Sequence, residues 1–136
     1  MKTHVEFRSD LFPPYPGEED EINSGRWGKR LAEFIRDGLK ERDFDVMDPF
    51  AEDWGWMVEI RNEAFPLWIG CGNIDGEDDA FLSFIEPSKP FVRKLLFKKI
   101  STEADVTKLQ TAFDSVLSSE PSIKEIRWSS KEEFGS

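Results

Sequence analysis

The chain has 136 residues and a mass of 15.8 kDa, which is the size of one domain with one hydrophobic core. Apolar residues make up only 38% of it, but aromatic residues make up 13%, so we expect a core of a few large rings. The net charge of −10 disfavours nucleic acid and anionic membrane as ligands and favours a basic partner. The sequence also lacks any apolar run near the ~20 residues that a membrane-spanning helix needs.

The charge is distributed unevenly along the chain. Residues 1–86 carry 21 acids and 9 bases, whereas residues 87–136 carry 7 acids and 9 bases. The single cysteine, Cys71, excludes an intramolecular disulfide, and no charged and then apolar leader opens the sequence. These features together predict a reducing compartment, and therefore a cytoplasmic location.

Residues 2–8 alternate between apolar and polar side chains, which predicts a half-buried strand. His4 is the only histidine, and the alternation puts it on the polar side of this strand. A metal site or a general base would need partners that the sequence does not offer, because no second histidine or paired cysteine accompanies His4. We therefore expect His4 to be an exposed strand residue.

Residues 9–24 hold three prolines and a glycine, which argue against regular structure in this segment. Because Leu11, Phe12 and Tyr15 also lie there, we expect an ordered loop pinned over the core edge or over a groove. The four acids of residues 18–21 come just before the next expected helix, whose positive N-terminal end they would complement.

That helix is expected over residues 25–42, with Ser24 as its N-cap. Its apolar residues recur at spacings of three and four and form a single stripe: Trp27, Leu31, Phe34, Ile35 and Leu39. Residues 43–49 follow as a short extended segment that ends at the proline.

The densest hydrophobic stretch predicts an antiparallel meander of three strands, at residues 54–60, 67–72 and 81–85. A turn at 61–66 and a long acidic loop at 73–80 connect them. Glycine stands at every second position of the middle strand, at Gly70 and Gly72. One face of that strand is therefore bare and admits a packed ring, a loop or a ligand.

Residues 87–100 hold five bases and no acid, and the segment is expected to form a helix capped by Ser88. Its apolar stripe would consist of Phe91, Val92, Leu95, Leu96 and Ile100. Such a segment could contact nucleic acid or anionic lipid. In a chain of net charge −10, we interpret its bases instead as balancing acids elsewhere in the molecule.

A last helix is expected over residues 102–119, capped by Ser101 or Thr102, and a final strand over 123–129. A polar tail, 130–136, follows, and its closing Gly135 and Ser136 are typical of a cloning scar. The whole chain, 1–136, is thus expected to be a single α+β domain. It would have an antiparallel sheet of about five strands in the order β-α-β-β-β-α-α-β, with helices packed on one face.

The sequence contains no Gly-x-Ser-x-Gly, no Walker loop and no His-Glu-x-x-His. The loop that begins at Asp75 has Ala80 where a calcium-binding EF-hand needs glycine. Cys71 lies between two glycines on a strand expected to be buried, so we interpret it as a small core residue. No catalytic, cofactor-binding or metal-binding residue is therefore predicted.

Our leading hypothesis is a non-enzymatic, acidic protein-binding domain of the kind that neutralises a bacterial toxin, with a basic protein as its partner. The domain itself would be a monomer or a weak dimer. Charge would steer the encounter, and aromatic anchors would supply most of the binding energy. The residues expected to contact the partner are Tyr15, Glu18, Glu19, Asp20, Glu21, Asp48, Glu52, Asp53, Trp54, Trp56, Asp75, Glu77, Asp78 and Asp79.

Two alternatives belong to other classes. A small-molecule-binding domain or small enzyme would use the tryptophans as a pocket wall with nearby carboxylates, and it predicts a closed aromatic cavity. A self-associating structural module predicts a symmetric dimer through the terminal strand or exposed apolar patches. The burial of Trp54, Trp56 and Trp68 distinguishes two interpretations of the meander. If all three are buried, the meander is only core. If any of them faces solvent beside the acidic loops, that surface is where we expect the partner.

Overall fold

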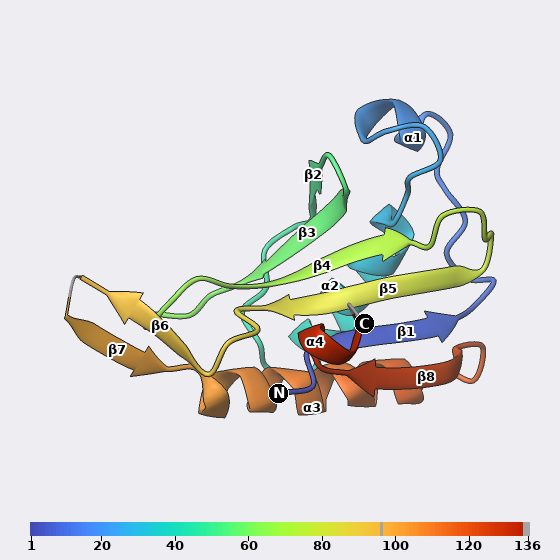
Figure 1. Ribbon diagram of the computed structural model, residues 1–136. Coiled ribbons are helices and arrows are strands. Elements are labelled where there is room, and N and C mark those ends of the chain that lie inside the picture. Colours follow the sequence, from blue (N-terminus) through green and yellow to red (C-terminus); the bar gives the residue numbers. More distant parts are fainter. Residues whose placement is uncertain (96, 135–136) are drawn as a thin grey trace.

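The computed structural model describes residues 1–95 and 97–134, and its main feature is a six-stranded antiparallel sheet (Figure 1). The strand order is β2 (Phe50–Glu52), β3 (Gly55–Ile60), β4 (Leu67–Asn73), β5 (Ala80–Glu86), β1 (His4–Arg8) and β8 (Lys124–Ser129). A separate two-stranded sheet consists of β6 (Phe91–Lys94) and β7 (Lys98–Ser101). The helices are α1 (Glu18–Glu21), α2 (Lys29–Lys40), α3 (Glu103–Ser118) and α4 (Lys131–Phe134).

The expected α+β class and antiparallel sheet are confirmed, although the main sheet has six strands instead of about five. The meander is present as β3, β4 and β5, with bounds within one residue of those expected. Strand β1 pairs with β5 on one side and β8 on the other, so the two ends of the chain meet in the sheet. Among the described residues, no helix is both long enough and apolar enough to cross a membrane.

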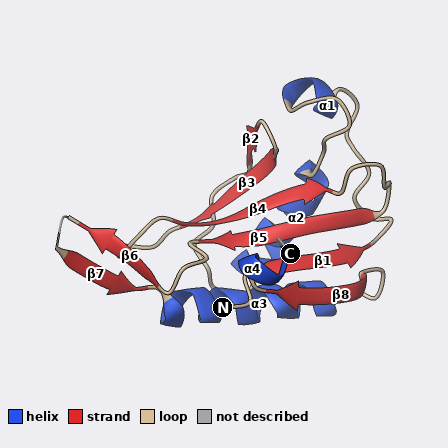
Figure 2. Cartoon of the chain, viewed as in Figure 1, coloured by secondary structure: helices blue, strands red, loops and turns tan. Residues whose placement is uncertain are grey.

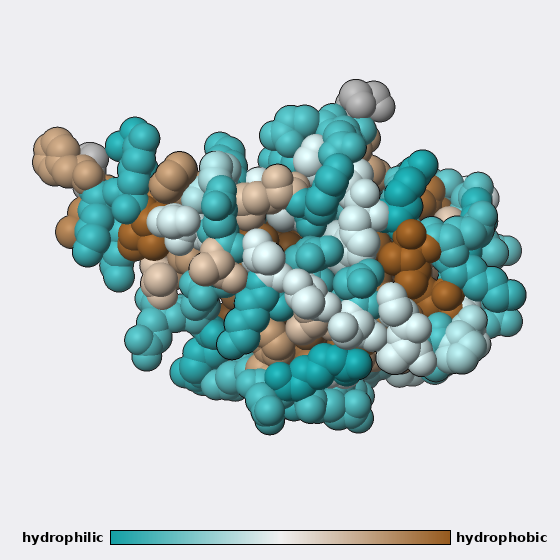
Figure 3. Space-filling view, turned by 90° about the horizontal axis from the view of Figure 1, so that it is seen from below, coloured by the Kyte–Doolittle hydropathy of each residue, from teal (hydrophilic) through white to brown (hydrophobic). Residues whose placement is uncertain are grey.

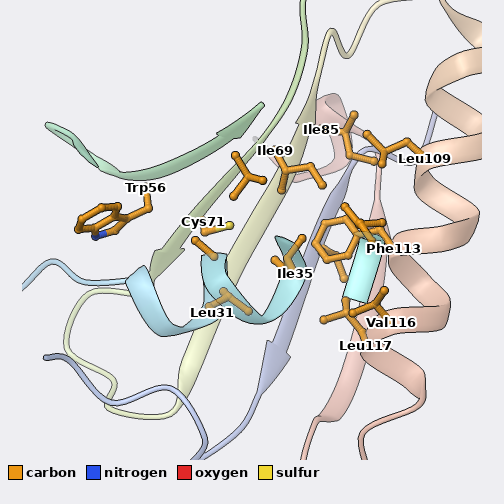
Figure 4. Close-up of a cluster of buried hydrophobic side chains, with 14 of the residues drawn as sticks. Leu31, Ile35, Trp56, Ile69, Cys71, Ile85, Leu109, Phe113, Val116 and Leu117 are labelled. Carbon is orange, nitrogen blue, oxygen red and sulfur yellow. The ribbon is translucent and has the colours of Figure 1, made fainter. Parts of the chain in front are cut away.

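Helices α2 and α3 lie together against one face of the main sheet, which Figure 2 shows by secondary structure. The core fills the space between them and contains Leu31 and Ile35 of α2, Ile69 of β4, and Phe113 of α3 (Figure 4). Each of these four side chains is fully buried. The other face of the sheet, the open face, is free of the two long helices.

Helix α2 starts at Lys29 and not at Gly25, and Ser24 does not cap it. The residues before it bind the end of β4 instead. Asn73 Oδ1 accepts a hydrogen bond from Trp27 N at 2.9 Å, and Asn73 Nδ2 donates one to Gly25 O at 2.9 Å. Because this pairing uses backbone groups that an earlier helical start would require, the helix begins after it.

Residues 18–21 form the short helix α1, although the segment 9–24 was expected to contain no regular structure. The three prolines all precede Gly17, so the acidic run itself is free to turn. Phe12 is buried and meets the ring of Phe81 edge to face, with 5.7 Å between centroids. The proline-rich part of the loop is thereby attached to the core.

The expected helix over 87–100 is wrong, because β6 and β7 form a hairpin there and Ser88 caps no helix. Val92 and Ile100 are paired across the hairpin and pack partly against the core. A helix would also have placed these two residues on one side, so their spacing alone could not separate the two structures. Leu96, which we had placed in the helical stripe, lies outside the described residues.

The expected polar tail forms α4, and it covers His4, which is therefore buried and not exposed. The imidazole lies between the rings of Phe84 and Phe134, with centroid distances of 5.5 Å and 5.4 Å. Its Nδ1 is 3.0 Å from Thr3 Oγ1. The strand alternation had placed His4 on the correct face, but the helix that closes over it comes from the other end of the chain. Gly135 and Ser136 lie outside the described residues.

Candidate functional site

An aromatic cluster occupies the open face of the sheet, and its members are Trp54, Trp68 and Phe84. The ring of Trp54 stacks on that of Trp68 at 5.9 Å between centroids, and it meets Phe84 at 5.4 Å. Trp68 and Phe84 meet edge to face at 5.6 Å. We call these three residues the open-face cluster.

The bare face of β4 is what admits this cluster. The rings of Phe84 and Trp54 both lie within contact distance of Gly70, where any side chain would collide with them. The bare face was expected to admit a packed ring, a loop or a ligand. The structure shows packed rings, and they come from the chain itself. The sheet thus carries exposed aromatic surface on a rigid strand framework.

The three tryptophans of the meander have different environments. Trp56 is only 4% exposed and belongs to the core on the helix-covered face (Figure 4), so it cannot contact a partner as expected. Trp54 is 38% exposed, and Trp68 is half-buried. Two of the three therefore present indole surface on the open face, beside residues that carry negative charge.

Residues 23–27 connect three segments that hold expected acidic contact residues, namely 18–21, 48–53 and 75–79. Asn23 Nδ2 donates a hydrogen bond to Asp53 O at 2.8 Å, which attaches the end of α1 to the β2–β3 turn. Arg26 forms an ion pair of 2.9 Å with Asp75 in the β4–β5 loop. The acidic segments are therefore gathered at the end of the sheet where β4 finishes, and we call this region the acidic end.

Glu18 was expected to contact a partner, but it is only 3% exposed and has an internal role. Its Oε2 accepts hydrogen bonds from Gly28 N at 2.7 Å and Lys29 N at 2.8 Å, and its Oε1 accepts one from Tyr15 N at 2.9 Å. The carboxylate thus satisfies free N–H groups at the start of α2, where negative charge is favoured. This burial removes Glu18 from the contact surface.

Some of the other expected contact residues make hydrogen bonds or ion pairs within the molecule, and others form no ion pair. Tyr15 donates a hydrogen bond to Glu33 at 2.6 Å, and the guanidinium of Arg30 lies 3.9 Å from its ring centroid. Four acids form ion pairs with arginines: Asp48 with Arg36, Asp75 with Arg26, and Glu77 and Asp79 with Arg8. The remaining acids among the expected contact residues form no ion pair with a described residue, and they are Glu19, Asp20, Glu21, Glu52, Asp53 and Asp78.

The open face also holds a row of residues that the sequence analysis did not select. Trp68 lies opposite Glu59 of β3 on one side and opposite Glu86 of β5 on the other. A hollow of about 310 Å³ lies beside this row and is lined by Glu59, Trp68, Met47, Met57 and Pro66, among others. The alternation of side chains put both glutamates on this face, but only the strand register shows that they flank the indole.

The described residues bear on two kinds of chemical site, a metal centre and a nucleophilic cysteine. Within 1–95 and 97–134, no three or more His, Cys, Asp or Glu side chains are placed to hold a metal ion. Cys71 is fully buried, and burial raises the pKa of its thiol to about 12, which disfavours the thiolate that nucleophilic chemistry requires.

Comparison with known proteins identifies no relative, because no family, no curated protein and no solved structure matches this chain.

Proposed function

We propose that this chain is a non-enzymatic domain that binds, and so neutralises, a basic protein partner through Trp54 and the acidic end. One observation carries the proposal: the exposed indole of Trp54 follows directly after Glu52 and Asp53, whose carboxylates have no ion-pair partner among the described residues. As parts of the same proposal, the site of action is the cytoplasm, and neither nucleic acid nor membrane is the ligand.

The physical basis is a combination of a rigid anchor and a negative field. Trp54 is held by Trp68 and Phe84, so binding to it costs little side-chain ordering, and tryptophan is among the residues enriched at binding hot spots. An indole face also attracts the cationic side chains of a basic partner. The unpaired acids around it would raise the association rate by attracting that partner over a distance.

Affinity capture from the source cells, followed by measurement with the purified partner, tests this proposal. The captured protein should be basic, and its dissociation constant should rise with salt concentration. Trp54→Ala should weaken binding by roughly 30-fold or more, as expected for a hot-spot tryptophan. The double variant Glu52→Gln/Asp53→Asn should slow association several-fold at low salt and much less at high salt.

Phe91→Ala is the matched control, because it removes a more exposed ring, 54% accessible, from a different part of the molecule. It should leave binding unchanged. A partner that is acidic, or one that Trp54→Ala still binds with full affinity, would show that the proposal is wrong. Capture of no protein at either low or moderate salt would also count against it.

A further inference from the structure

The β6–β7 hairpin projects from the body of the molecule (Figure 1). It carries exposed apolar side chains. Phe91, Leu95 and Phe97 are 54%, 86% and 93% exposed. In Figure 3 the projecting end of the molecule, at the left, shows apolar residues among hydrophilic ones. Among the described residues of the hairpin, Val92 and Ile100 are the ones that pack against the core, so folding of the monomer does not account for the exposed Leu95 and Phe97.

The hairpin is also strongly basic, and its charge is not balanced locally. Its five cations are Lys89, Arg93, Lys94, Lys98 and Lys99, and the segment 87–102 contains no acid. None of these cations forms an ion pair with a described residue. Our interpretation that these bases balance acids elsewhere in the chain therefore has no support from ion pairs.

A surface that carries acidic side chains lies beside the base of the basic hairpin. Residues 62–66 line one hollow, which they share with Arg93 and Lys94 of the hairpin. Asn62 and Pro66 also line a second hollow, together with Glu59 and Trp68 on the open face. The second hollow, of about 310 Å³, combines apolar walls with the polar side chains of Glu59, Arg61 and Asn62, and Arg61 forms an ion pair with Asp45. Glu59, Glu63 and Glu86 at this end have no ion pair with a described residue either.

We propose that two copies of this chain associate through these surfaces, with the hairpin of each copy docked on the Glu59–Trp68–Glu86 row of the other. Phe97 would enter the hollow beside Trp68, and Lys98 and Lys99 would meet the glutamates. Within one molecule this contact is not made, since Phe97 is almost fully exposed. This inference goes beyond the proposed function, because it concerns the end of the sheet where β4 begins.

The arrangement of the two surfaces favours a closed dimer. Because hairpin and hollow lie next to each other on one end of the molecule, a two-fold axis between them satisfies both contacts at once. The same acids argue against an anionic membrane as the ligand of the hairpin. Glu59, Glu63 and Glu86 would be repelled by anionic lipid, whereas in the dimer they are the partners of the cations.

Sedimentation velocity over a concentration series, up to roughly 1 mM, tests the dimer. The wild type should show a concentration-dependent and salt-sensitive monomer–dimer equilibrium. The charge reversals Lys98→Glu/Lys99→Glu and Glu59→Lys/Glu86→Lys should each weaken self-association at least tenfold. An equimolar mixture of the two variants should recover dimerisation to within about threefold of wild type, because the reversed charges then face each other.

Lys40→Glu/Lys124→Glu makes the same charge change at exposed positions away from the hairpin and should leave the equilibrium unchanged. A wild type that stays monomeric throughout, or a mixture that fails to recover, overturns the proposal. Co-sedimentation of the monomer with vesicles of phosphatidylcholine and phosphatidylserine, lost in Lys98→Glu/Lys99→Glu, would assign the hairpin to a membrane and overturn it too. Binding of the basic partner should survive the hairpin variant, so the two proposals can fail separately.

Discussion

A Cβ atom on Gly70 would lie 2.4 Å from Cζ of Phe84 and 2.9 Å from Cη2 of Trp54. The absence of a side chain at this one position therefore sets how closely the two rings approach the sheet. Since Trp54 is the proposed anchor for a partner, the same glycine links the packing of the open face to the geometry of the candidate surface.

Gly70→Ala should push the rings of Phe84 and Trp54 away from β4 and lower the free energy of unfolding by about 1–3 kcal/mol, as overpacking does. Tryptophan fluorescence should shift at the same time, because the Trp54 environment changes. Urea denaturation followed by fluorescence measures both effects. Gly72→Ala is the control, since the nearest atom to its added Cβ is Trp54 O at 3.4 Å. Equal losses in the two variants would contradict the packing explanation.

Glu18→Ala should destabilise the fold by about 2–4 kcal/mol, because it leaves the N–H groups of Gly28, Lys29 and Tyr15 without their charged acceptor. Glu18→Gln, which keeps one acceptor oxygen but no charge, should lose less. Glu21→Ala, an exposed change in the same short helix, should stay within about 0.5 kcal/mol of wild type. Thermal or urea unfolding compares the three. A stable Glu18→Ala variant would show that the cap is dispensable.

Gly38 allows α2 to pack closely on α3, because a Cβ there would lie 2.6 Å from Cγ1 of Val116. Gly38→Ala should therefore destabilise the protein by about 1–3 kcal/mol, despite the higher helix propensity of alanine. Val116→Ala alone should also destabilise it, by opening a cavity. The double variant should lose less than the two single losses added together, since the new methyl group fills the space. Strict additivity in a double-mutant cycle would refute a direct contact.

His4 should make the fold less stable in mild acid. Burial lowers its pKa from the usual 6.5, and Lys131 adds to this effect, while Glu86 and Glu132 oppose it. The folded state thus binds fewer protons than the unfolded state below pH 6.5, so this contribution to stability is present at neutral pH. It should be lost as the pH falls through 6.5 towards the folded pKa.

Urea unfolding at pH 7, 6 and 5 checks this expectation against His4→Asn. The carboxylates titrate in both proteins, so the difference between their stability curves isolates the histidine. The wild type should lose more stability on acidification than the variant does. Parallel curves would mean that protonation of His4 is not coupled to folding.

Much of the fold could be predicted because its signals are local. The alternation in β3, β4 and β5 and the helical stripe of α3 depend on neighbouring residues, and their bounds were correct to within one residue. The start of α2 could not be predicted in this way. It depends on Asn73, which lies 48 residues after Gly25 in the chain and competes for its backbone groups.

For the candidate site, too, the features that depend on local sequence could be predicted, and those that depend on contacts between distant segments could not. The sequence alone determined the net charge, the acidic segments and the bare face of β4, because composition and a period of two residues are properties of the chain itself. Only the tertiary structure decided that Glu18 and Trp56 are buried, that Trp54 is exposed, and that Glu59 and Glu86 flank Trp68. The physical reason is that burial and cross-strand proximity arise from contacts between distant segments, and no local pattern specifies which segments meet.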